Sequence, residues 1–112
     1  MLGAFVDGRL VGTAGFYRDW GLKRRHRGHI WGMYVAPAHR GQGLGRALLD
    51  ALLERARAIP DLTQVLLGVS ASQTAAKQLY TSLGFECFGR EPDALRVGRE
   101  LFDEEHMVLR LR

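Results

Sequence analysis

Residues Arg40-Gly41-Gln42-Gly43-Leu44-Gly45-Arg46 decide the fold, because they separate a strand-like segment that ends at Pro37 from a strongly helical one. Glycine at three of these positions allows a tight turn and lets a ligand approach the backbone amides without meeting a Cβ atom. The first N–H groups of a helix have no intrahelical partner and lie at the positive end of the helix dipole. Arg40 and Arg46 add positive charge on either side. The segment therefore predicts a strand-to-helix turn that binds an anion.

The glycine-rich turn does not match the two common nucleotide-binding motifs. It lacks the Gly-Lys-Ser/Thr ending of a P-loop. No acidic residue stands where a dinucleotide-binding fold would contact the ribose. Both classes of nucleotide site are therefore disfavoured, and identifying the anion requires other residues.

The rest of the chain alternates between strand-like and helical patterns. Asp7-Gly8 favours a type I′ turn and predicts an opening β-hairpin. Apolar residues at three- and four-residue spacing predict two amphipathic helices, the first stopped by Pro60 and the second closed by Gly84, with Ser70 and Ser72 as candidate caps. The expected elements are strands at 2–6, 9–16 and 30–35, a helix at 44–59, a strand at 64–69, a helix ending at 83, and strands at 85–88 and 106–111 separated by a charged loop.

This order of elements predicts a single domain over residues 1–112 with an α/β (α+β) fold, in which a mixed sheet is flanked by two helices. The first three strands should be antiparallel, and the third and fourth, which a helix joins, should be parallel. The single cysteine, Cys87, excludes an intrachain disulfide. No apolar run approaches the roughly 20 residues that span a bilayer. We therefore expect a cytoplasmic protein without a membrane partner.

The formal net charge of +4 suits an anionic partner, and a polyphosphate cofactor qualifies as readily as nucleic acid. The densest basic run, residues 23–27, lacks the nearby aromatic residues typical of RNA-binding segments. We expect no nucleic-acid partner. A basic nucleic-acid-binding domain would instead show salt-sensitive binding to DNA or RNA.

Two segments resemble the motifs of a known family. Tyr34 to Gly45 resembles motif A of the GNAT family of N-acetyltransferases, whose core is Gln or Arg, two residues, Gly, one residue, then Gly or Ala. Gln73 to Phe85 is similar to motif B, which ends in Leu-Tyr, three residues and Gly-Phe. The resemblance covers nearly all of the chain. It implies acetyl-coenzyme A (acetyl-CoA) as co-substrate, no metal, and transfer of the acetyl group to an amine of a small molecule or peptide.

The resemblance also implies which residues bind acetyl-CoA. Backbone groups of Met33, Tyr34 and Val35 would hold the pantetheine arm in a wedge between the third and fourth strands. The amides of Gln42 to Arg46 would bind the pyrophosphate. Gln73 stands where the family usually has Asn, and it would make a further cofactor contact.

Catalysis needs a group that protonates the departing thiolate and a donor that stabilises an oxyanion. The resemblance assigns the first role to Tyr80. A backbone N–H near Met33 or Tyr34 could serve the second. The alternative for Tyr80 is a residue packed against the sheet with its hydroxyl at the edge.

The general base is less determined. Relatives often carry Glu on the third strand or on the strand before motif B, but no carboxylate occurs between Asp19 and Asp50, and residues 66–69 read Leu-Leu-Gly-Val. His29 occupies the third-strand position and would share a face with Trp31 and Met33 if the strand is regular. Imidazole, with an ordinary pKa of about 6.5, suits a base that works through water. His106, which follows an acidic cluster, and water are the alternatives.

A site without a carboxylate base favours an amine of low pKa. A lysine side chain costs about 4 to 5 kcal/mol to deprotonate at neutral pH, whereas an α-amino group costs only about 1 kcal/mol. We therefore expect an α-amino acceptor to react faster than an ε-amino acceptor.

The GNAT fold normally begins with another strand and one or two helices, and the sequence lacks these N-terminal elements. Either the N-terminus lies upstream, or another subunit covers the sheet, so a homodimer is the expected assembly. The alternative function is a truncated module that binds acetyl-CoA with weak or no turnover.

Overall fold

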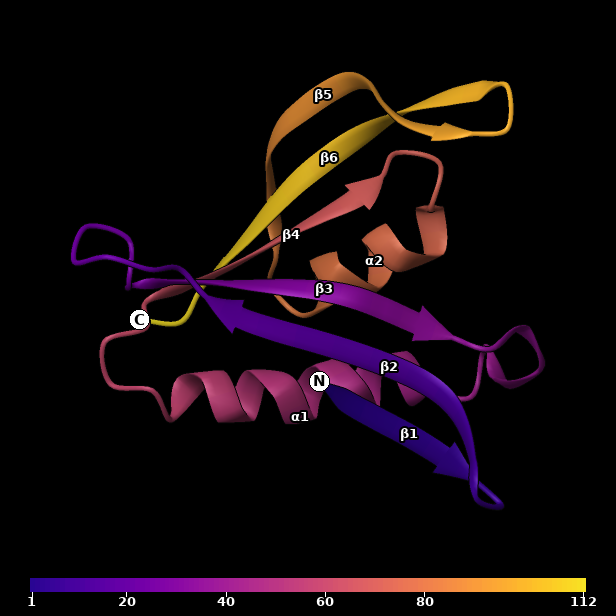
Figure 1. The fold of residues 1–112 in the computed structure, drawn as a ribbon, viewed down its shortest axis with the longest axis horizontal. Coiled ribbons are helices and arrows are strands. Elements are labelled where there is room, and N and C mark those ends of the chain that lie inside the picture. The colour runs from indigo at the N-terminus through magenta and orange to yellow at the C-terminus, as the bar shows by residue number, and fades with distance from the viewer. The chain divides into compact units, whose positions relative to one another are not determined.

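A computed structural model describes residues 1–112. The chain divides into two compact units, Met1–Thr63 and Gln64–Arg112. The first contains β1 (Leu2–Val6), β2 (Arg9–Arg18), β3 (Arg27–Val35), the 3₁₀ turn η1 (Pro37–His39) and α1 (Leu44–Arg57) (Figure 1). The second contains β4 (Gln64–Ser70), α2 (Thr74–Ser82), β5 (Glu86–Val97) and β6 (Glu100–Arg110). Neither helix is both long and apolar enough to cross a membrane.

In the first unit, β1, β2 and β3 form an antiparallel sheet. Asp7 and Gly8 have φ angles of 51° and 77°, and positive values at both positions are what a type I′ turn requires, so the predicted hairpin is confirmed. The connection from β2 to β3 closes where the Asp19 N–H donates to the Arg27 carbonyl at 3.0 Å. The helix α1 runs along one face of this sheet and packs against all three strands (Figure 1).

The helix α1 is amphipathic, as predicted, with an apolar stripe toward the sheet, and it ends two residues earlier than expected. It contacts the sheet closely at Gly12, where an added Cβ atom would lie 3.1 Å from Leu48 Cδ1. Gly43 caps its N-terminus with a φ of 79°, a conformation that glycine adopts without strain. The stripe consists of Leu48, Leu49, Leu52, Leu53 and Ala56.

The strand β3 contains a bulge at Gly32. Trp31 is opposite Gly15 and Tyr34 is opposite Thr13, so two residues of β3 face one residue of β2 between these pairs. Gly32 has a φ of 62°, and its carbonyl accepts a hydrogen bond from the Thr13 hydroxyl at 2.8 Å. A side-chain hydrogen bond therefore fixes the bulge in place.

The bulge changes which side chains of β3 share a face. In a regular strand, His29, Trp31 and Met33 would point the same way. The extra residue shifts the alternation, so Tyr34 instead of Met33 returns to the face of His29 and Trp31. The expectation that Met33 shares that face assumed a regular strand, and it is wrong for this reason.

In the second unit, β6 lies between β4 and β5 and is antiparallel to both. Residues 89–105, predicted to be a charged loop, are almost entirely in β5 and β6, with Gly98 in the turn. That prediction was wrong because most side chains of β5 are exposed and the segment lacks apolar alternation. Cross-strand charges help to hold the hairpin instead, as in the 2.7 Å ion pair of Arg90 with Asp103.

The helix α2 ends as predicted, with Gly84 following the C-cap at a φ of 102°. The two candidate capping serines do not cap it. The hydroxyls of Ser70 and Ser72 bond each other at 2.8 Å, and Gln73 occupies the N-cap without a side-chain hydrogen bond. The buried apolar residues of this unit are Val65, Leu66, Leu67, Val69, Tyr80, Phe85, Met107 and Leu109.

Candidate functional site

The turn between η1 and α1 has the geometry of an anion-binding site. Gly41 and Gly43 both have a φ of 79°, and a Cβ atom added at either would meet no atom within 4 Å. No side chain caps α1, and its first turn carries no acidic residue. The first amides of α1 are therefore not engaged by a capping side chain, and the surface beside the glycines is open. These features fit a pyrophosphate group.

Arg40 ties this turn to the end of β3. Its Nε donates to the Val35 carbonyl at 2.9 Å, and its backbone N–H donates to the Pro37 carbonyl at 3.4 Å. Arg40 was predicted only as a phosphate contact. Its position also fixes the strand end, where Val35 belongs to the backbone predicted to hold the pantetheine arm.

His29 lies on β3 beside a carboxylate that the sequence analysis did not assign to it. Its Nε2 lies 2.9 Å from Asp19 Oδ2. Its ring stacks on Tyr17, with 4.7 Å between centroids and 13° between planes. The hairpin register places Tyr17 directly opposite His29, which brings Asp19 next to the imidazole. The same register, extended from the opening strands, is the signal that could have found this pair.

The electrostatics around Asp19 favour its charged form. The contact with His29 holds the pKa of the Asp19 carboxyl below its usual range, and the charges of Arg27 and Arg24 act in the same direction. Arg27 Nε lies 3.8 Å from Asp19 Oδ2. A hollow of about 330 Å³ opens beside Asp19 in the β2–β3 connection, where the Trp20 side chain is almost fully exposed.

Tyr80 lies in the second unit, on α2. Its ring is 5% exposed and packs edge-on against Phe85, with 5.9 Å between centroids. Burial raises the pKa of the Tyr80 phenol, so the hydroxyl keeps its proton at neutral pH. A protonated phenol is the state that a proton donor needs. Gln73, the other predicted site residue of this unit, stands at the N-terminus of the same helix.

His106, the alternative base, lies on β6 among carboxylates. Its Nε2 contacts Glu91 Oε1 and lies 3.5 Å from Glu104 Oε1. One ring nitrogen of His106 and one carboxylate oxygen of each glutamate lie within 4.8 Å of one another. Strand alternation puts this cluster on the opposite face of β6 from Glu105, which pairs with Lys77 of α2. The structure therefore ties His106 to two acidic partners, and His29 to one.

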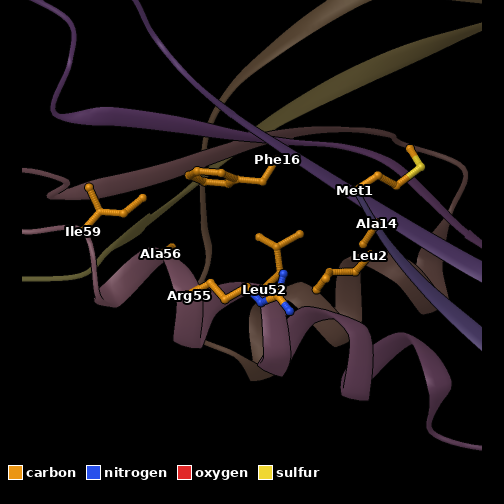
Figure 2. A pocket seen from close by; sticks show the side chains of 8 residues that line it. All are labelled: Met1, Leu2, Ala14, Phe16, Leu52, Arg55, Ala56 and Ile59. Carbon is orange, nitrogen blue, oxygen red and sulfur yellow. The ribbon is translucent and has the colours of Figure 1, made fainter.

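A separate apolar pocket of about 200 Å³ lies between α1 and the first two strands (Figure 2). Its only charged side chain is Arg55, and it contains no nucleophile or general base. No predicted site residue lines it, so the chemistry is not assigned to this pocket. It is lined by Met1, Leu2, Ala14, Phe16, Leu52, Arg55, Ala56 and Ile59.

The sequence matches the model of the acetyltransferase (GNAT) family over residues 1–85. This range includes the glycine-rich turn and the whole Gln73–Phe85 segment. The chain belongs to the acetyltransferase (GNAT) family. The resemblance drawn from the two motifs is thereby confirmed.

Curated GNAT relatives are longer than this chain. The L-methionine sulfoximine/L-methionine sulfone acetyltransferase of Pseudomonas aeruginosa is 38% identical over 105 residues, which are 93% of this chain and 60% of that protein. The L-2,4-diaminobutyric acid acetyltransferase of Streptomyces anulatus is 37% identical over 76 residues, which are 68% of this chain and 40% of that protein. The chain therefore spans 60% or less of the length of these two relatives.

Solved GNAT structures share the fold. The GNAT acetyltransferase from Streptococcus pneumoniae matches with a TM-score of 0.90 at 26% identity, covering 96% of this chain and 64% of that one. The yncA protein from Salmonella typhimurium, in a structure with its cofactor acetyl-CoA, matches with a TM-score of 0.87 at 29% identity, covering 98% and 63%. The predicted α/β fold of the GNAT type is confirmed.

Proposed function

We propose that this protein is an acetyl-CoA-dependent N-acetyltransferase acting on an amine of a small molecule or peptide. The observation that carries the proposal is the turn at Gly41 and Gly43, with its open surface and its uncapped helix amides. Acetyl-CoA supplies the acetyl group as a thioester, and its pyrophosphate is the kind of anion that such a turn suits. Membership of the GNAT family supports the same reaction.

The binding roles follow the residues predicted from the sequence. The amides of Gln42 to Arg46 bind the pyrophosphate, and Arg40 adds a charge-assisted contact while fixing the turn to β3. Backbone groups at the end of β3, from Met33 to Val35, hold the pantetheine arm. Gln73 makes a further contact at the N-terminus of α2.

The reaction requires one group to take up a proton and another to give one up. His29 accepts the proton that the acceptor amine loses as its nitrogen bonds to the thioester carbonyl carbon. The carbon–sulfur bond breaks, and Tyr80 gives its proton to the departing sulfur and regains one from water. A backbone N–H at Met33 or Tyr34 stabilises the negative charge that develops on the carbonyl oxygen.

The acceptor is an amine of low pKa, with an α-amino group as the leading class. A histidine base removes a proton from such an amine at much lower cost than from a lysine side chain. The names of the relatives support a small amino-acid acceptor: L-methionine sulfone carries an α-amino group, and L-2,4-diaminobutyric acid carries both an α-amino and a γ-amino group. Comparing initial rates on α-amino and ε-amino acceptors across pH tests this preference.

Calorimetry with acetyl-CoA and an assay of coenzyme A release against an amine panel test the function itself. We expect binding and amine-dependent release. Tight binding without release from any amine would favour a non-catalytic module, and no heat of binding would overturn the proposal altogether. Substituting His29→Gln and His106→Gln separately identifies the base, because only loss of the base should lower kcat about a hundredfold or more.

We also propose a cytoplasmic protein that folds as one domain over residues 1–112 and forms a homodimer. Support for association comes from the edge strand β1 and its neighbour, where Phe5 is 66% exposed and Leu10 is 55% exposed. Sedimentation analysis over a range of concentrations tests the dimer, and a monomer at all concentrations would contradict it.

A further inference from the structure

We propose that Asp19 is the positioning residue for His29, keeping the proton on Nε2 so that Nδ1 presents its lone pair to the acceptor amine. The proposal rests on the proposed function, in which His29 is the base. Nothing in the sequence motifs or in the family match assigns a role to Asp19. It lies between β2 and β3, outside both motif segments.

The 2.9 Å contact between Asp19 Oδ2 and His29 Nε2 decides the tautomer. If the proton were on Nδ1, the Nε2 lone pair would face a carboxylate oxygen at this distance, and the two would repel each other. With the proton on Nε2, an N–H dipole faces the negative charge instead. Nε2 is shut off from water, so the carboxylate of Asp19 is the polar group that its N–H dipole faces.

The second imidazole nitrogen is left available. No hydrogen bond or ion pair within the chain involves His29 Nδ1. Tyr17 stacks on the ring from β2, which limits its rotation. The carboxylate and the stacked phenol therefore fix the ring by two different contacts, and Nδ1 is the nitrogen that can accept a proton.

The groups that face this pair keep the carboxylate charged. They are Arg27 from β3, with its Nε 3.8 Å from Asp19 Oδ2, and Arg24 from the β2–β3 connection, while Tyr17 is the other titratable side chain against the ring. The helix α1 packs on the opposite face of the sheet, as its contact at Gly12 indicates. When Nδ1 takes the amine proton, the imidazolium forms beside a negative charge, and it later releases the proton to water.

The substitution Asp19→Asn tests the proposal, because it removes the charge and lets an amide donate to Nε2. Asp61→Asn is the matched control, since Asp61 is a more exposed carboxylate of the same unit that pairs with Arg25 at 3.5 Å. Long-range proton–nitrogen NMR of the imidazole reports which nitrogen carries the proton. We expect an Nε2-protonated His29 in the wild type and in Asp61→Asn, and a substantial Nδ1-protonated fraction in Asp19→Asn.

Kinetics provide the second readout. We expect kcat to fall about ten- to hundredfold in Asp19→Asn, with the KM for acetyl-CoA within about twofold of the wild type, and we expect Asp19→Glu to recover part of kcat. An unchanged tautomer in Asp19→Asn, or a kcat equal to that of Asp61→Asn, would overturn the proposal. Absence of turnover in the wild type would instead overturn the proposed function, and the NMR result would still decide whether Asp19 positions His29.

Discussion

The substitution Gly43→Ala separates backbone strain from anion binding at the glycine-rich turn. Gly43 has a φ of 79° at the N-cap of α1, and Gly8 in the β1–β2 turn has a φ of 77°. An added Cβ atom meets nothing within 4 Å at either position. Alanine should therefore cost the same backbone strain energy at both positions. Gly8→Ala is the control, because Gly8 has no predicted part in binding.

The expected loss of stability is similar in the two variants. Alanine in the left-handed region costs about 1 to 2 kcal/mol. Alanine also lowers the conformational entropy of the unfolded chain, which offsets about 0.4 to 1 kcal/mol of this loss of stability. A net loss of about 1 kcal/mol corresponds to a fall in Tm of about 4 °C for a chain of this size. Differential scanning fluorimetry should show this fall in both.

Only Gly43→Ala should weaken the binding of acetyl-CoA. Its Cβ atom projects where the ligand is proposed to approach the amides, and losing one hydrogen bond to a charged phosphate costs about 1.5 to 3 kcal/mol. That cost raises Kd by about ten- to hundredfold. Isothermal titration calorimetry measures the change directly. The reasoning fails if Gly43→Ala binds acetyl-CoA within twofold of Gly8→Ala.

Three further substitutions test other parts of the structure. Tyr80→Phe should lower kcat about a hundredfold with little change in Tm, because the hydroxyl makes no hydrogen bond within the chain. Steady-state kinetics measures kcat and calorimetry measures Tm. A kcat equal to that of the wild type would mean that Tyr80 has a purely structural role. Gly15→Ala should lower the free energy of unfolding, measured by chemical denaturation, by about 1 to 3 kcal/mol, because its Cβ atom would lie 2.6 Å from Trp31 Nε1. Gly89→Ala, whose Cβ atom would meet nothing within 4 Å, should change the free energy of unfolding little. Lys77 holds the pKa of Glu105 below its usual value of 4.5, so this pair stabilises the fold above about pH 4.5 and stops doing so as pH falls through the lower native pKa. The difference in Tm between wild type and Lys77→Met should therefore shrink on acidification to about pH 2, and a constant difference would argue against the ion pair.

The parts of the fold that depend on local sequence were predictable. The hairpin at Asp7-Gly8 follows from the backbone angles that this dipeptide adopts. The helix α1 follows from the three- and four-residue spacing of its apolar residues, and the end of α2 follows from Gly84. In each case, residues close in sequence determine the conformation, so periodicity and turn chemistry suffice.

The parts that depend on pairing between strands were not predictable in the same way. The β5–β6 hairpin has no apolar alternation along β5 and is held partly by charges such as Arg90 and Asp103, which a composition argument assigns to a loop. The bulge at Gly32 depends on the register of β2 and β3 and on the Thr13 hydroxyl. Without the register, an alternation count along β3 cannot show that an extra residue has been inserted.

The candidate site likewise contains one part that depends on local sequence and one that depends on strand pairing. Its proposed anion-binding turn is a continuous segment, so the sequence alone indicates which residues form it. The partner of His29 could not be predicted from the pattern along β3, because Asp19 is ten positions away and lies outside that strand. Only the antiparallel pairing of Tyr17 with His29 brings that carboxylate to the imidazole.

The bulge at Gly32 divides β3 into two segments of opposite parity, so odd-numbered residues before it and even-numbered residues after it point to the same sheet face. Before it, substitutions at His29 or Trp31 alter the chemistry of one sheet face; after it, the chain resumes with Tyr34 in phase with them. A side chain in the first segment can therefore be substituted without changing the strand register that leads into the glycine-rich turn. The Thr13 hydroxyl donates to the carbonyl of the residue at which the two segments meet.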